Sequence, residues 1–133
     1  ILKKKKIKNV HFLGSHSQDY VYEIYKKSKA VFVSLRNSEV LNLTIPYKIQ
    51  SYLSAGKLII GSVSGITKKI IINNKLGFCC KNDDIEKLEE IIAKVYFLKI
   101  KELKKIEKNS RNYFEKNFQL KNTIKKLSKI INA

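Results

Sequence analysis

Cysteine is scarce in this sequence, and its two copies, Cys79 and Cys80, are adjacent. A disulfide between neighbouring residues is strained, and no second Cys or His pair has the spacing of a metal site. The two cysteines lie in a short apolar run, where free cysteine behaves as a small hydrophobic residue. We therefore expect buried, reduced thiols, a cytoplasmic protein, and no bound metal or cofactor.

Long hydrophobic runs are also missing. No apolar stretch approaches the ~18 residues that a membrane-spanning helix requires. The opening Ile1-Leu2, which precedes a run of lysines, is too short for the apolar region of a signal peptide. The sequence contains no methionine, hence no initiator, and shows no repeat, linker or second domain. We expect a single domain over residues 1–133, cut from a longer protein.

Negative charge is the third scarce feature. The chain has 28 Lys+Arg against 11 Asp+Glu, which gives a formal net charge of +17. Such an excess suits a polyanionic partner: nucleic acid, anionic lipid or a phosphorylated ligand. Nearly all of the positive charge is lysine, and the chain is also rich in isoleucine and asparagine. All three have AT-rich codons, so a biased genome explains the charge at least equally well.

The hydrophobic pattern predicts alternating strands and helices. Pro46 suits the start of a helix and Gly56 its end, while the acidic segment 82–84 suits the N-cap of another helix. The expected strands are residues 9–14, 30–34, 58–60 and 77–80, and the expected helices are residues 18–28, 47–55, 66–73, 85–98, 101–117 and 120–132.

This order predicts an α/β fold, in which a parallel sheet is covered by helices on both faces and followed by C-terminal helices. Ligands of such sheets bind at the carboxyl ends of the strands. The informative segments are therefore the loops after the strands, residues 14–18, 35–45 and 62–66. These loops carry the polar and glycine residues that the strands lack.

The helix that follows Pro46 is the sharpest local signal. A helix N-terminus offers free backbone N–H groups and a partial positive charge, and both suit a diphosphate. Lys48 lies in the first turn, where a cation opposes the helix dipole at a cost of ~0.3–1 kcal/mol. A bound phosphate would offset that cost. The alternative is an ordinary surface lysine in a lysine-rich chain.

Segments along nearly the whole chain carry a family resemblance. They are VHFLG (residues 10–14), YEIYKKSKAVFV (22–33), PYKIQSYLSAGKL (46–58), SGI (64–66), LGF (76–78) and SRNYFEKNF (110–118). In this order they resemble motifs of the retaining GT-B glycosyltransferases of group 1 (family 4). The third segment is similar to that family's Pro-x-Lys-x-x-Glu-Tyr-x-x-x-Gly-Lys-Pro pattern, and its KIQSYL variation is similar to some bacterial surface-polysaccharide enzymes.

The resemblance implies the later part of a Rossmann-like, donor-binding domain, with the N-terminal acceptor domain and the first strands absent. It implies a full-length enzyme that transfers a sugar from a nucleotide-sugar donor, UDP-linked, to a polysaccharide or a lipid-linked glycan such as lipopolysaccharide or capsule. The chain alone is then expected to be inactive, and no catalytic residue is assigned. The donor-binding residues that it implies are Lys48, Ser51, Asn42, Thr44, Gly14, His16, Ser64 and Gly65.

Three positions depart from the family pattern. The family has two glutamates eight residues apart, and here Leu43 and Ser51 occupy those positions, with Glu39 nearby but out of register. In the family the second glutamate holds the ribose hydroxyls, and a serine makes a weaker contact there. Leu58 replaces a proline, which is a mild change.

Other interpretations remain open. The charge fits a nucleic-acid- or anionic-membrane-binding module, although the aromatic residues do not alternate with lysines as base stacking requires, which disfavours nucleic acid. Residues 99–133, with 11 Lys+Arg and 3 Glu, offer a basic face to anionic lipid on the inner side of the cell membrane. A different GT-B enzyme, such as a sugar-nucleotide epimerase, would need acidic and histidine catalytic residues in the cleft, which this sequence does not show. His11, inside an expected strand, is assigned a structural role.

Overall fold

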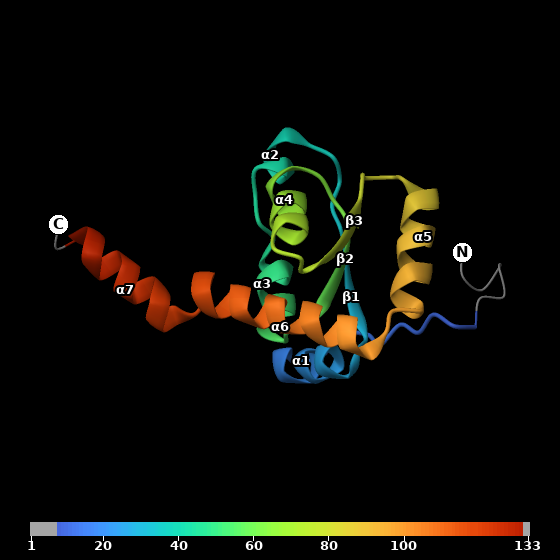
Figure 1. The fold of residues 1–133 in the computed structure, drawn as a ribbon, viewed down its shortest axis with the longest axis horizontal. Coiled ribbons are helices and arrows are strands. Elements are labelled where there is room, and N and C mark those ends of the chain that lie inside the picture. Colours follow the sequence, from blue (N-terminus) through green and yellow to red (C-terminus); the bar gives the residue numbers. More distant parts are fainter. Residues whose placement is uncertain (1–7, 132–133) are drawn as a thin grey trace.

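The structure, a computed structural model, describes residues 8–131 apart from the side chain of Lys126. The lysine run near the start and the last residue of the helix expected over 120–132 lie outside the described residues. The elements, in chain order, are α1 (Gln18–Lys27), β1 (Ala30–Ser34), α2 (Glu39–Asn42), α3 (Tyr47–Ser54), β2 (Leu58–Ser62), α4 (Gly65–Asn73), β3 (Gly77–Cys80), α5 (Ile85–Tyr96), α6 (Ile100–Asn117) and α7 (Leu120–Ile131) (Figure 1).

The three strands form an open, parallel sheet in the order β1-β2-β3. Ala30 lies opposite Leu58 in one pair of strands, and Ile59 lies opposite Gly77 in the other. All five residues of the central strand β2 are buried. A parallel strand covered on both faces has no solvent side, so its sequence, LIIGS, is apolar or small throughout.

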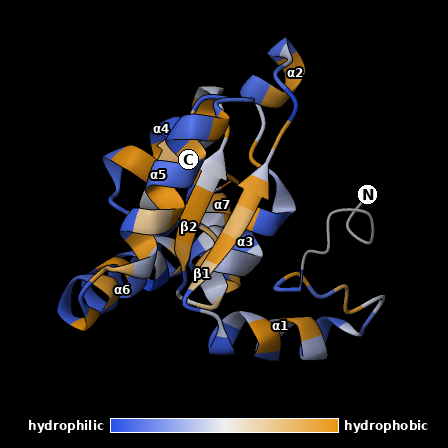
Figure 2. Cartoon of the chain, turned by 90° about the vertical axis from the view of Figure 1, so that its right-hand side faces the viewer, coloured by the Kyte–Doolittle hydropathy of each residue, from blue (hydrophilic) through white to orange (hydrophobic). Residues whose placement is uncertain are grey.

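Helices cover both faces of the sheet and build two hydrophobic clusters. Residues of α3 and α4, including Ile49, Leu53 and Ile71, pack with one side of the strands. Ile91 and Val95 of α5 pack with the other side. Figure 2 shows β1 and β2 as mostly hydrophobic strands between these helices. The predicted Rossmann-like α/β fold with helices on both faces is confirmed.

Helix α6 crosses the sheet near the start of β2 and fastens the turn that joins α3 to β2 (Figure 1). Gly56, with φ +65°, ends α3, and its N–H donates to Leu53 O while Lys57 N–H donates to Tyr52 O. The fully buried Ser110 hydroxyl of α6 donates to Lys57 O at 3.0 Å. Lys57 Nζ lies 2.8 Å from Glu107 Oε1. This end of α3 is therefore fixed in position by α6.

Two predicted elements differ from the structure. Residues 9–14 form no strand, and their apolar side chains are exposed, with Phe12 84% exposed. A strand needs a neighbour for its backbone hydrogen bonds, and within residues 8–131 β1 pairs only with β2. His11 is consequently exposed rather than structural. The segment 35–44, expected to be irregular, contains the short helix α2, whose N-cap Ser38 accepts a hydrogen bond from Leu41 N–H.

Both cysteines are free thiols. Cys80 is buried as predicted, at 2% exposed, whereas Cys79 is only partly buried. Burial raises the pKa of the Cys79 thiol to about 12, although Lys68 opposes the shift. A thiol with so high a pKa stays protonated at neutral pH and is a poor nucleophile.

Gly77 offers a test of the strand packing. A Cβ at this position would lie 1.9 Å from Ile59 O, so Gly77→Ala must push β3 away from β2. We expect the substitution to lower the free energy of unfolding by at least ~3 kcal/mol, measured by urea denaturation. Gly14→Ala is the control, because Gly14 has φ +78° but, apart from its chain neighbours, no described residue has an atom within 4 Å of the added carbon. It should cost ~1–2 kcal/mol, and equal losses for the two variants would contradict this account.

Candidate functional site

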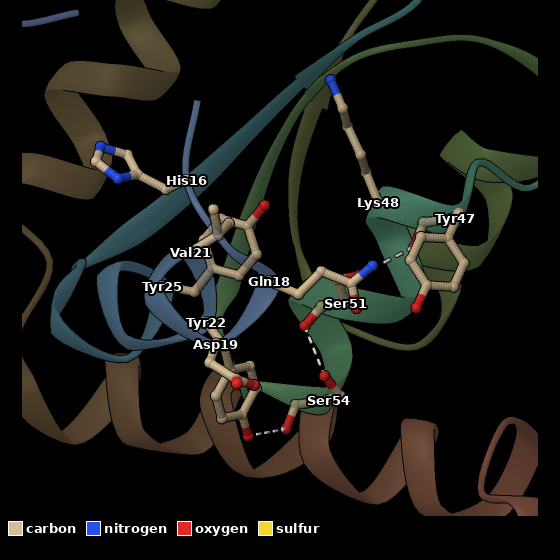
Figure 3. A pocket seen from close by; sticks show the side chains of 10 residues that line it. All are labelled: His16, Gln18, Asp19, Val21, Tyr22, Tyr25, Tyr47, Lys48, Ser51 and Ser54. Atoms are coloured by element: carbon tan, nitrogen blue, oxygen red, sulfur yellow. Dashed lines mark hydrogen bonds between the residues drawn. The ribbon is translucent and has the colours of Figure 1, made fainter. Parts of the chain in front are cut away.

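A cleft of about 370 Å³ lies between α1 and the side of α3 that carries Tyr47, Lys48, Ser51 and Ser54. Figure 3 shows side chains of the two helices facing each other across it. The lining combines aromatic, amide, carboxylate, hydroxyl and ammonium groups, which is the mixed character of a small-molecule site. Its residues are His16, Gln18, Asp19, Val21, Tyr22, Tyr25, Tyr47, Lys48, Ser51 and Ser54.

The loop before α1 brings His16 to one end of the cleft. Ser17 caps the helix by accepting a hydrogen bond from Tyr20 N–H. The His16 ring lies 4.3 Å from the Tyr20 ring, centroid to centroid, and its Nε2 donates to Leu13 O at 2.6 Å. Since a carbonyl oxygen only accepts, Nε2 carries the hydrogen of this bond.

The start of α3 supplies the positive charge of the cleft. Pro46 is the N-cap and contributes no side-chain hydrogen bond. The first N–H groups of α3 therefore have no capping side chain. Lys48 is exposed and, within the described part of the chain, has no ion pair, unlike Lys57 and Arg111, which contact carboxylates. A helix N-terminus and an unpaired ammonium group together favour an anion.

Hydroxyl groups form the middle of the cleft. The Ser51 hydroxyl makes only a long contact, 3.5 Å, with Tyr47 O of its own helix. The Ser54 hydroxyl donates to Ser51 O at 2.8 Å, and Ser54 O accepts from the Tyr22 hydroxyl at 3.3 Å. Arg111 of α6 donates to the same oxygen at 2.6 Å. The polar atoms of Ser54 are thus occupied by hydrogen bonds within the protein. The Ser51 hydroxyl has only its long contact and is available to bind a ligand.

Tyr52 joins the cleft to the sheet. Its hydroxyl donates to Phe32 O of β1 at 3.0 Å, and its ring meets the Tyr25 ring edge-on at 5.0 Å. Burial, with a smaller contribution from Tyr25, raises the pKa of Tyr52 to about 12. This contact holds α1 and α3 at a set position against β1.

Four of the other predicted residues form a second group at the carboxyl ends of the strands: Asn42, Thr44, Ser64 and Gly65. Asn42 donates to Asn37, and the Thr44 hydroxyl donates to Leu41 O. A Cβ on Gly65 would lie 2.0 Å from Asn42 O, so only glycine lets α2 and α4 approach this closely. The backbone oxygen of Thr44 accepts from Thr67 of α4 at 3.0 Å. A short segment of the chain connects this group to Pro46, which precedes the first residues of the cleft on α3.

Asn82 is a residue that the sequence argument missed. Its side chain donates to Leu35 O and accepts from the Ser64 hydroxyl, which joins the segments that follow β1, β2 and β3. The segment 82–84 predicted only a helix cap, and the cap is Asp84, which accepts from Lys87 N–H at 3.0 Å. A polar residue two positions after the strand predicted over residues 77–80 was the available signal.

The structure therefore brings together three of the eight predicted donor-binding residues, His16, Lys48 and Ser51, in the cleft. Gly14 lies in the preceding loop, and the other four lie in the second group. The aromatic lining was also missed, although Tyr22 and Tyr25 follow Asp19 at three-residue intervals on one face of α1.

The described residues, 8–131, contain no cluster of three or more histidine, cysteine or acidic residues arranged to hold a metal ion. None of their helices is both long and apolar enough to cross a membrane.

The comparisons with known proteins give one match. The family model described as "Glycosyl transferases group 1" matches residues 1–113, which include the cleft and the second group. No curated protein and no solved structure matches the chain.

Tyr52→Phe tests the hydrogen bond from the Tyr52 hydroxyl to Phe32 O, which joins α3 to β1 beside the cleft. The folded state favours the neutral phenol, because its pKa is raised from 10.0 to about 12. The neutral Tyr52 phenol therefore contributes to the free energy of unfolding of the wild type below pH 10. That contribution is lost as pH rises from about 10 to 12. We expect the variant to lose about 1 kcal/mol at pH 8 and to show a shallower decline above pH 10. Chemical denaturation at several pH values measures both, with Tyr47→Phe, which removes an exposed phenol, as control. Parallel profiles for wild type and Tyr52→Phe would contradict the assignment.

Proposed function

The chain belongs to the group 1 glycosyl transferases, and from this membership we propose that its cleft holds the nucleoside diphosphate of a nucleotide-sugar donor. Sugar transfer is the activity of the family. The observation that carries the proposal is the meeting of Lys48, the uncapped start of α3 and the Ser51 hydroxyl with aromatic rings in one cleft.

Each part of the donor has a matching feature. The diphosphate lies against Lys48 and the first N–H groups of α3, where the helix dipole favours negative charge. The ribose hydroxyls bond to Ser51, whose own contact is long at 3.5 Å. The base packs among the tyrosine rings, where a flat π-system is favoured. Gln18 and Asp19 then offer an amide and a carboxylate to its polar edge.

The sugar of the donor extends from the cleft toward the second group. The connecting segment runs from Asn42 and Thr44 to Pro46, directly before the start of α3. Asn42, Thr44 and Ser64 supply hydroxyl and amide groups for sugar hydroxyls. Asn82 acts as a positioning residue, because it holds Ser64 and the segment after β1 together.

The chemistry follows from this placement. An acceptor hydroxyl oxygen forms a bond to the anomeric carbon as the bond from that carbon to the diphosphate oxygen breaks. The diphosphate leaves with the electron pair, and the proton of the acceptor hydroxyl passes to a departing diphosphate oxygen. Lys48 and the α3 dipole stabilise the charge that develops on the departing oxygens. Family analogy adds retention of the anomeric configuration.

The finer features of the enzyme are part of the same proposal. The donor is UDP-linked, and the acceptor is a bacterial polysaccharide or a lipid-linked glycan. The chain acts as the later part of a donor-binding domain in a cytoplasmic enzyme whose acceptor domain lies elsewhere in the full protein. Support for these features comes from the KIQSYL segment and the order of the family motifs.

An amide NMR titration of the chain with UDP, GDP and uridine tests donor binding. We expect saturable shifts around His16, Lys48 and Ser51 that persist at moderate salt, with UDP bound more tightly than GDP. Lys48→Gln should raise the Kd for UDP about tenfold, or ~1.4 kcal/mol, by removing one charge-assisted hydrogen bond. It should leave the weaker binding of uridine unchanged.

The matched control is Lys101→Gln, an exposed lysine at the start of α6, which should bind UDP as the wild type does. Equal weakening by both variants would mean that UDP responds only to net charge. Tight binding of a short DNA, lost steeply with salt and without any UDP response, would instead favour a basic nucleic-acid-binding module.

A further inference from the structure

Helix α1 forms one wall of the cleft, yet little of it is packed into the core. None of its ten residues is buried. Among the described residues of the helix, only Tyr25 packs against a hydrophobic cluster. A helix with so few buried contacts owes its position to individual interactions with its neighbours.

Two tyrosines of α1 contact α3. The Tyr25 ring meets the Tyr52 ring edge-on at 5.0 Å, and the Tyr22 hydroxyl donates to Ser54 O at 3.3 Å. Lys26 Nζ also lies 5.4 Å from the centroid of the Tyr22 ring, but it belongs to α1 and moves with it. The contact at Tyr25 alone would let α1 pivot. The bond to Ser54 O therefore sets the position of the Tyr22 ring, which lines the cleft.

The oxygen that Tyr22 binds is one of the carbonyls at the end of α3 that lack a partner within the helix. The N–H groups of Gly56 and Lys57 close the turn onto earlier carbonyl oxygens. Side chains complete Ser54 O instead, Tyr22 from α1 and Arg111 from α6, whose Nη1 donates at 2.6 Å. The arginine bond is charge-assisted and the shorter of the two, and the negative end of α3 favours a cation.

The guanidinium group of Arg111 is held in a set orientation on α6. Its Nε donates to Glu115 Oε1 at 2.8 Å, and its Cζ lies 5.7 Å from the centroid of the Phe114 ring. Phe114 in turn packs against the hydrophobic cluster that includes α3. Arg111 and Glu115 are about half exposed, so their ion pair matters for the direction of the group rather than for its energy. The planar fork then presents Nη1 to Ser54 O in a fixed direction.

We propose that Arg111 is a positioning residue for the cleft. Through Ser54 O it fixes the Tyr22 ring, and with it the wall against which a flat ligand ring packs. Arg111 is not among the residues that line the cleft, so it acts through this oxygen and not by touching a ligand. The effect on ligand binding rests on the proposed function, in which the base of the donor lies among the tyrosines, whereas the placement of Tyr22 does not.

A second contact between the same two helices supplies the matched control. Glu107 of α6 pairs with Lys57, just beyond the end of α3, at 2.8 Å, and neither residue lines the cleft. Glu107→Gln therefore weakens the attachment of α6 to this end of α3 without removing a donor from Ser54 O. A purely structural role for Arg111 would make Arg111→Gln and Glu107→Gln act alike.

Tyrosine ring NMR of the ligand-free chain tests the placement directly. The resonances of Tyr22 are assigned by their loss in Tyr22→Phe. Arg111→Gln should shift them, Arg111→Lys, which keeps a donor for Ser54 O, should shift them less, and Glu107→Gln should leave them in place. The ring of Tyr96, exposed on α5, should be unchanged in every variant and reports that the fold is intact.

Uridine separates positioning from net charge, because it is neutral. Lys48→Gln is expected to leave its binding unchanged, whereas Arg111→Gln should raise the Kd of uridine and of UDP by the same factor, about fivefold, a typical coupling within one hydrogen-bond network. Tyr22→Phe should have a similar effect. The double variant Arg111→Gln/Tyr22→Phe should stay near the effect of either single variant, because both act on the same contact.

Three results would overturn the proposal. An unmoved Tyr22 ring in Arg111→Gln, or an equal movement in Glu107→Gln, would mean that Arg111 does not place it. A raised Kd for UDP with an unchanged Kd for uridine would mean that Arg111 contributes only charge. Effects that multiply in the double variant would mean that Arg111 and Tyr22 act separately. A Tyr22 ring that shifts in Arg111→Gln, when the wild type binds neither UDP nor uridine, would support the placement and contradict only the donor proposal.

Discussion

The complete burial of β2 is the constraint on which the rest of the structure depends. Its five residues pair with β1 on one side and β3 on the other and are covered above and below. A strand in this position needs helices on both faces, and the two hydrophobic clusters meet at its alternate side chains, Ile59 on one face and Leu58 and Ile60 on the other. The loops that leave the carboxyl ends of the strands therefore gather on one edge of the sheet.

The two ends of helix α3, which lines the cleft along its length, are held differently. Its last turn is closed by Gly56 and fastened to α6 through Lys57, Glu107 and Ser110. Its first turn carries Lys48 without a carboxylate partner in the described part of the chain. A rigid helix with a free, positively charged start is suited to hold a diphosphate in a set position, since it loses little conformational freedom on binding.

The predictions succeeded where local chemistry decides the structure and failed where distant partners decide it. Gly56 ends α3 because a residue with positive φ is needed there, and a glycine at that position is visible in the sequence. Residues 9–14 read as a strand, yet strand formation depends on a neighbour, and a local pattern cannot show whether one is available. Asn82 was assigned only to a helix cap, because its partners, Leu35 and Ser64, lie far away in the sequence.

The sequence by itself determined the fold class, most helix bounds and the presence of a cation at the start of α3. These follow from periodicity and from glycine, proline and capping residues, which act over a few neighbouring positions. Only the tertiary structure decided that α1 lies against α3 and that Ser51 shares a cleft with Tyr22 and His16. The reason is physical, because these outcomes depend on how separate amphipathic helices distribute themselves around one buried strand, and side chains from distant segments meet only once that packing is complete.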